Sequence, residues 1–258
     1  MTRLIVLVGT LLVIAGCSST NPGTEIKPTN SNEETQTQKL ARVHTQLAAG
    51  YYTRNQQNIA LEELNEALKV DPKYAPAHNV LGLVYTELKE DAKAEQAFRK
   101  AMELAPQDPD IRNNYGSFLC GKGQVKLGIE QFIAAARHPL YRTPEVALIN
   151  AGQCSIRIGE VGEAERHFRQ ALVLAPTAVA ASYGLAEIAL KRANYTEARD
   201  HMKNVMRAPN PPAPALLIGA CVEKKLGDRV AELSYIQQLR NRYPESKELK
   251  DLLGGTCQ

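Results

Sequence analysis

Apolar and small residues recur along residues 40–253 at the three- and four-residue spacings of amphipathic helices. The apolar stretches are short and come in pairs, and a proline follows several of the pairs, at Pro72, Pro106 and Pro176. Because proline cannot continue a helix, it ends one pair and lets the next begin. The pattern predicts an all-α chain built from pairs of antiparallel helices.

The pattern also repeats at a fixed interval. The residues Leu47, Ala48, Tyr51, Ala60, Leu64, Ala67 and Pro72 are matched 34 positions later by Leu81, Gly82, Tyr85, Ala94, Phe98, Ala101 and Pro106. A period of 34 residues is that of the tetratricopeptide repeat, in which helix pairs stack side by side. Small residues such as Gly82 are expected where the two helices of a pair touch, and large ones such as Phe98 fill the gap beside them.

About six such units span residues 40–253. The third contains Gly116, and after it the period slips by two residues through the segment 138–144. Residues 245–253 are expected to form a short helix that caps the last apolar edge, followed by a tail at 254–258. The whole array is predicted to be a right-handed superhelix, an α-solenoid, with a concave inner face.

Residues 1–16 have the features of a bacterial signal peptide. Arg3 precedes an apolar stretch that is shorter than the roughly 20 residues needed to span a bilayer. The stretch ends in IAGC at residues 14–17, which resembles the lipobox of bacterial lipoproteins, and the Cys17 thiol would accept the lipid. Ser18 stands where an aspartate would resemble an inner-membrane retention signal. The resemblance implies a lipid anchor in the cell outer membrane, on its periplasmic face; the alternative is an ordinary signal that ends in cysteine.

Residues 17–39 combine the lipidated cysteine with polar residues and almost no apolar side chains. Such a segment cannot bury enough surface to order itself, so it is predicted to be a flexible tether. About 21 residues of flexible chain have a root-mean-square reach of roughly 25 Å. The folded array is therefore expected to hang a short distance from the membrane.

Composition and motifs disfavour catalysis. The chain is 44% hydrophobic but only 5% aromatic, and its formal net charge of +3 includes no basic cluster, so nucleic acid is not an expected partner. No phosphate-binding, zinc-protease or nucleophile motif is complete. Histidines spaced 34 residues apart follow from the repeat and lack a third ligand. We expect no metal, no cofactor besides the lipid on Cys17, no small-molecule substrate and no enzymatic activity.

The inner face of such an array is its candidate binding surface. In this repeat the second, fifth, ninth, twelfth and thirteenth residues of each unit line the concave side. In the first three units these positions include Arg42, Thr45, Ala49, Tyr52, Asn79, Leu83, Thr86, Asn113 and Ser117. The mixture, mostly apolar and neutral polar, suits an extended or helical segment of a partner protein. The alternative for any single member is that it merely faces water.

Three segments are more specific than the repeat itself: residues 113–120 (NNYGSFLC), 139–141 (PLY) and 150–154 (NAGQC). With the lipobox, they resemble the PilW family, also called PilF, of type IV pilus biogenesis lipoproteins. The resemblance implies a pilotin, which helps the pilus secretin reach the outer membrane and assemble into its ring, so that twitching motility depends on it. The alternative is a repeat lipoprotein that serves another envelope machine, such as barrel assembly or control of cell-wall hydrolases.

Four thiols remain once Cys17 carries lipid: Cys120, Cys154, Cys221 and Cys257. An even number in an exported chain favours disulfides, but four cysteines allow three pairings. The repeat register places Cys120 and Cys154 on neighbouring first helices, and both lie in the segments that resemble the PilW family, so we expect them to pair. The alternative is two buried thiols, and the state of Cys221 and Cys257 is left open.

The mature protein is expected to begin at Cys17 and to fractionate with outer membranes. Replacing Cys17 with alanine removes the thiol that accepts the lipid, so the variant should be lost from that fraction. Mass spectrometry of the N-terminal peptide and density-gradient separation of membranes check both points. Native protein found with inner membranes would contradict the interpretation of Ser18, and a membrane-bound, fully functional variant would show that the anchor is dispensable.

Overall fold

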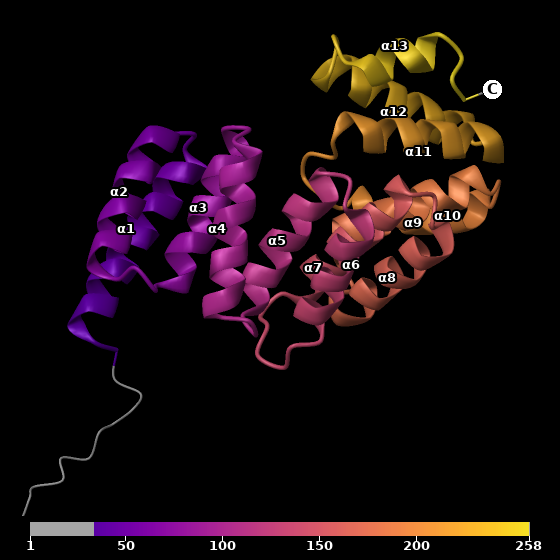
Figure 1. Ribbon diagram of the computed structural model, residues 1–258. Helices are drawn as coiled ribbons and strands as arrows, with labels where there is room; N and C mark the ends of the chain where they lie inside the picture. The colour runs from indigo at the N-terminus through magenta and orange to yellow at the C-terminus, as the bar shows by residue number, and fades with distance from the viewer. Residues whose placement is uncertain (1–33, 258) are drawn as a thin grey trace, which may run out of the picture. The chain divides into compact units, whose positions relative to one another are not determined.

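The computed structural model describes residues 34–257, in which there are thirteen α-helices and no strand. Twelve of these helices form six pairs that follow one another along the chain (Figure 1). The first helices of the pairs are α1 (Gln36–Thr53), α3 (Ala75–Glu87), α5 (Pro109–Gly121), α7 (Pro144–Arg157), α9 (Val179–Lys191) and α11 (Ala213–Leu226). The second helices are α2 (Gln57–Val70), α4 (Asp91–Leu104), α6 (Val125–Ala136), α8 (Val161–Leu174), α10 (Tyr195–Val205) and α12 (Arg229–Arg242). The prediction of an all-α repeat superhelix is confirmed.

A last helix, α13 (Lys247–Leu253), packs on α11 and α12 and covers the end of the array. Its Leu249 is 7% exposed and joins a cluster with Leu216 and Leu239. The cap therefore buries apolar surface of the sixth pair that would otherwise face water. Within residues 34–257, no helix has both the length and the apolar character to cross a lipid bilayer.

The start of the array is set by a capping box. The Thr35 hydroxyl accepts a hydrogen bond from the Gln38 N–H (3.1 Å), and the Gln38 side chain accepts one from the Thr35 N–H (3.0 Å). These two bonds satisfy backbone donors that a helix start leaves unpaired, so α1 begins at Gln36 and takes in the last part of the predicted tether. The predicted signal peptide, Cys17 and the tether as far as residue 33 lie outside the described residues.

In three of the helix pairs a phenylalanine of the second helix lies against a glycine of the first helix. These pairs of residues are Gly82 with Phe98, Gly116 with Phe132, and Gly152 with Phe168. The three phenylalanines are at most 1% exposed. A methyl group added at Gly82 or Gly152 would lie 2.7 or 2.6 Å from the facing ring, closer than carbon atoms can approach. Only glycine therefore allows the two helices to come so close together.

The turn inside each pair places one residue in the left-handed backbone region. These residues, with their φ angles, are Asn55 (58°), Lys89 (60°), Gly123 (81°), Gly159 (76°), Ala193 (59°) and Gly227 (76°). Glycine adopts this region without steric cost, whereas Lys89 and Ala193 carry side chains that disfavour it. The tight packing of the helix pair therefore imposes the turn even where the local sequence opposes it.

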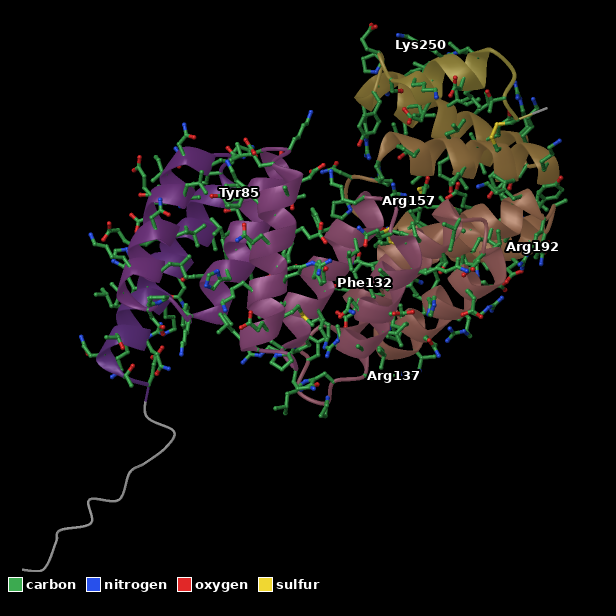
Figure 2. The ribbon with its side chains drawn as sticks, in the orientation of Figure 1. Tyr85, Phe132, Arg137, Arg157, Arg192 and Lys250 are labelled. Carbon is green, nitrogen blue, oxygen red and sulfur yellow. A yellow bond between two sulfur atoms is a disulfide. The ribbon has the colours of Figure 1, made fainter. Side chains whose placement is uncertain are left out.

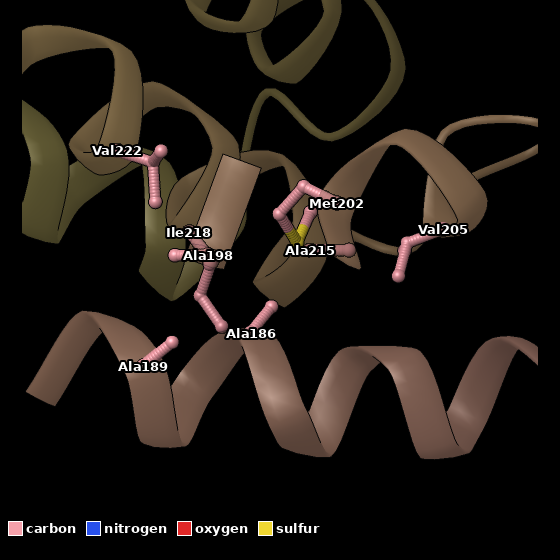
Figure 3. Close-up of a cluster of buried hydrophobic side chains, with 8 residues drawn as sticks. All are labelled: Ala186, Ala189, Ala198, Met202, Val205, Ala215, Ile218 and Val222. Carbon is pink, nitrogen blue, oxygen red and sulfur yellow. The ribbon is translucent and has the colours of Figure 1, made fainter. Parts of the chain in front are cut away.

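Successive pairs are joined by a further layer of small apolar side chains. Between the fifth and sixth pairs, Met202 and Ala198 of α10 pack with Ala186 of α9 and with Ala215 and Ile218 of α11 (Figure 3). The flexible methionine fills the irregular gap that small residues leave. Because alanine dominates this layer, neighbouring helices approach closely and the core continues from one pair to the next.

Gly152→Ala should destabilise the protein by about 1–3 kcal/mol, because the added methyl group overpacks the core against Phe168. Gly162→Ala is the matched control, since nothing lies within 4 Å of the position of its Cβ and the residue lies in the first turn of α8. Alanine there should be neutral or stabilising by up to roughly 1 kcal/mol. Urea unfolding followed by circular dichroism compares the two variants, and equal changes in stability would contradict this account of the packing.

Candidate protein-binding groove

The eight residues predicted to bind a partner lie on the first helices of the first three pairs. Arg42, Thr45 and Tyr52 are on α1, Asn79, Leu83 and Thr86 are on α3, and Asn113 and Ser117 are on α5. Direct contacts join α1 to α3, α3 to α5 and α5 to α7. The first helices therefore form a continuous surface, called here the groove, and the binding role of these residues stays a prediction.

Several predicted groove residues have structural contacts of their own, among them Thr45, Thr86 and Leu83. The Thr45 hydroxyl donates to the Ala41 carbonyl oxygen, and the Thr86 hydroxyl donates to the Gly82 carbonyl oxygen, both at 2.7 Å. Leu83 packs against an aromatic cluster that α4 and α5 share. Thr45 is only 6% exposed. Substitutions at these three positions would disturb helix packing as well as any contact with a partner.

Asparagine side chains connect three of the first helices. Asn114 Nδ2 of α5 donates to Asn79 Oδ1 of α3 at 3.3 Å, and Asn150 Nδ2 of α7 donates to Asn113 Oδ1 of α5 at 3.0 Å. An amide has two N–H donors and two acceptor lone pairs, so each of these side chains keeps further capacity to bond a peptide backbone. Asn114 and Asn150 are not among the groove residues predicted from the sequence, although both lie in the segments that resemble the PilW family.

A hollow of 190 Å³ lies where α5 and α7 meet, and its lining residues are Ser117, Cys120, Phe132, Asn150, Gln153, Cys154 and Arg157. The exposed Arg157 guanidinium donates to the Cys120 carbonyl oxygen at 2.9 Å (Arg157 and Phe132 are labelled in Figure 2). Arginine has five N–H donors, so Arg157 can also bond a carbonyl or carboxylate oxygen of a bound segment. Sequence reasoning missed Arg157 because its place depends on how α7 stacks on α5.

At the end of the groove formed by α1 and α3, a tyrosine lies near a carboxylate. Burial raises the pKa of the Tyr52 phenol above its usual value, and the nearby Glu87 carboxylate raises this pKa further. The phenol is therefore neutral at physiological pH and offers an O–H donor between α1 and α3. The groove thus contains a carboxylate near the Tyr52 phenol and a guanidinium at Arg157.

Two disulfides fasten first helices to later parts of the chain. Cys120 of α5 is bonded to Cys154 of α7, with Cα atoms 6.2 Å apart. Cys221 of α11 is bonded to Cys257, with Cα atoms 5.0 Å apart. The first bond spans the place where the repeat period slips, and the second holds the C-terminal segment against the sixth pair.

Acidic and histidine side chains do not gather into a metal site in residues 34–257, since no group of three His, Cys, Asp or Glu residues could hold an ion there. His44 Nδ1 instead lies 2.7 Å from Glu63 Oε2, in a contact between α1 and α2.

Models of the tetratricopeptide repeat match three stretches of the chain, at residues 50–89, 75–108 and 156–210. These stretches fall on the helix pairs described above. The fold and the matches together define a tetratricopeptide-repeat protein.

Similarity to type IV pilus proteins extends over most of the chain. The protein is 27% identical over 238 residues to the type IV pilus assembly protein PilF of Pseudomonas aeruginosa, covering 92% of each chain. The crystal structure of PilW, described as a widely conserved type IV pilus biogenesis factor, matches with a TM-score of 0.75 and 32% identity, over 85% of this chain and 100% of that one. The structure of P. aeruginosa PilF matches with a TM-score of 0.79 and 26% identity, over 85% and 99%. The chain therefore belongs to the PilW/PilF family of tetratricopeptide proteins of type IV pilus biogenesis.

Replacing Cys120 and Cys154 together with serine should lower the free energy of unfolding by about 2–4 kcal/mol, because the bond constrains a loop of 34 residues in the unfolded chain. Replacing Cys221 and Cys257 together is the matched control and should loosen mainly the C-terminal segment. Hydrogen exchange and urea unfolding compare the two double variants. Non-reducing peptide mapping of native protein should recover both pairs, and free thiols at Cys120 and Cys154 would refute the first pairing.

Proposed function

We propose that this protein is the pilotin of a type IV pilus: a lipoprotein, anchored in the outer membrane through Cys17, that binds the pilus secretin and promotes its localisation and multimerisation. The observation that carries the proposal is the similarity to PilF, which covers 92% of both chains. A pilus-biogenesis protein with a lipid anchor and a partner-binding groove is suited to hold a membrane-bound component while it assembles. The full-length match favours this role over service to barrel assembly or cell-wall hydrolases.

The first helix supports the proposal, because it offers apolar surface at the end of the array. Val43 is 44% exposed, whereas the equivalent residues one and two repeats later, Ala77 and Ile111, are 0% and 1% exposed. Leu40 and Leu47 lie on the same side of α1 and are 44% and 46% exposed. Terminal repeats usually need a polar outer face. This apolar edge is therefore a suitable contact for an amphipathic segment of the secretin.

The groove supplies polar contacts that continue from this edge. A partner segment lying along the first helices would meet the Tyr52 phenol, then the amides of Asn113 and Asn150, and then the Arg157 guanidinium. Hydrogen bonds from such side chains bind the backbone of an extended segment, while apolar contacts select its side chains. The protein acts in this proposal by holding the secretin, without chemistry on it.

Ser117→Glu combined with Gln153→Glu should weaken secretin binding by about tenfold or more, because two carboxylates are placed in the groove beside the hollow at α5 and α7. Both residues are exposed, so the fold should be kept. Surface pili, twitching motility and secretin multimers in the outer membrane should fall with the affinity. Pull-down of the secretin and gels that retain its multimers measure the effect.

Lys126→Glu is the matched control, since it makes the same change in net charge at an exposed position on α6, away from the groove. It should leave secretin multimers and pili unchanged. Normal secretin capture by the folded groove variant would remove the groove from the proposal, and normal secretin multimers after deletion of the gene would remove the pilotin role itself.

A further inference from the structure

A second hollow lies outside the groove, where the second helices α6 and α8 flank the side of α7. Its volume is 340 Å³, near the lower end of the range typical of ligand pockets. The apolar part of its lining consists of Ile133 and Ala136 of α6, Leu148 of α7, and Val173 and Leu174 of α8. This hollow, called here the α6–α8 pocket, contains none of the predicted groove residues.

The apolar wall of the α6–α8 pocket is unusual for its place in the repeat. Val173 is 81% exposed and Leu174 is 53% exposed. Val173 lies nine residues after Ala164, the small residue near the start of α8. In the other five repeats the equivalent position holds Lys69, Glu103, Arg137, Arg207 and Arg240. Five repeats thus present a charge to water where the fourth presents a valine. An exposed aliphatic pair beside a hollow is typical of a binding site.

The remaining lining residues make the pocket cationic. Arg137 stands at the end of α6, as Figure 2 shows, and Arg166 and Gln170 project from α8. No carboxylate lines the pocket, and Arg137 has no acidic partner among residues 34–257. Arg166 pairs with Glu163 on its own helix, but both side chains are about half exposed, and such surface pairs exchange readily. The pocket therefore combines an aliphatic wall with two guanidinium groups.

We propose that the α6–α8 pocket binds the free C-terminus of a partner polypeptide whose last residue is aliphatic. A C-terminal leucine, isoleucine or valine has an apolar side chain and a carboxylate on the same residue, which matches the combination of an aliphatic wall with guanidinium groups in the lining. The side chain contacts Leu148 and Val173, and the carboxylate accepts hydrogen bonds from Arg137 and Arg166 in the geometry that guanidinium groups favour. The charge of the pocket selects the terminus over an internal aliphatic residue. This site is independent of the groove and of the proposed pilotin role.

The test uses the mature full-length protein in lipid nanodiscs and a fluorescein-labelled heptapeptide that ends in two leucines with a free carboxylate. Fluorescence anisotropy should show saturable binding below roughly 1 mM. The same peptide with a C-terminal amide should bind at least about tenfold more weakly, and a peptide ending in two serines should not bind. Arg137→Gln with Arg166→Gln should reduce binding of the acid to the level of the amide, without changing the amide. Val173→Lys should weaken both peptides.

Arg207→Gln is the matched control, because it removes an arginine from the equivalent place in the fifth repeat. It should leave both affinities unchanged, and circular dichroism should show every variant folded. Equal binding of acid and amide, or unchanged binding to the Arg137 and Arg166 double variant, would overturn the proposal. Displacement of the peptide by dodecanoate at lower concentration than by the unlabelled peptide would assign the pocket to fatty acids and would also overturn it.

Discussion

The close approach of the two helices within each pair is the constraint on which the rest of the structure depends. Glycine on the first helix faces a phenylalanine on the second in the second, third and fourth pairs, and a Cβ at Gly82 would lie 2.7 Å from the Phe98 ring. The short separation buries the rings almost completely and brings the ends of the two helices together. The intervening turn is then forced into the left-handed region, even at Lys89 in the second pair. Local geometry here follows from packing.

The stacking of one helix pair on the next, in contrast to the packing inside a pair, decides which side chains meet in the groove. Position within the repeat tells which helix a residue occupies, but contacts between helices of different repeats depend on how the pairs rotate against one another. The bonds from Asn114 to Asn79 and from Asn150 to Asn113 cross from one first helix to the next. The Cys120–Cys154 disulfide does the same at the slip in the period. The middle of the groove is thus fixed by polar and covalent links in addition to apolar burial.

The difference between packing within a helix pair and stacking between pairs explains how much of the structure the sequence could predict. The helix pairs and their number followed from the spacing of small and large residues, because that spacing is the packing rule itself. The start of α1 was missed by four positions, because the polar composition before residue 40 outweighed the capping signal of Thr35 and Gln38. Leu83 shows the limit for the site: its register points to the groove, yet its side chain joins the aromatic cluster between α4 and α5. Arg157 and the α6–α8 pocket could not be predicted, since both are made by residues that only stacking brings together.

Helix α7 links the two candidate sites, because it contributes to both sides of the array. Asn150, Cys154 and Arg157 line the groove, whereas Leu148 forms part of the α6–α8 pocket. The helix is bonded to α5 by the disulfide and packed on α8 through the contact of Gly152 with Phe168. Both attachments are close-packed, so occupancy of one site reshapes the other only if α7 has a second stable packing against its neighbours. Rigid attachment of this kind suits a scaffold that holds two partners at a constant separation. An allosteric role would instead require α7 to have two stable positions.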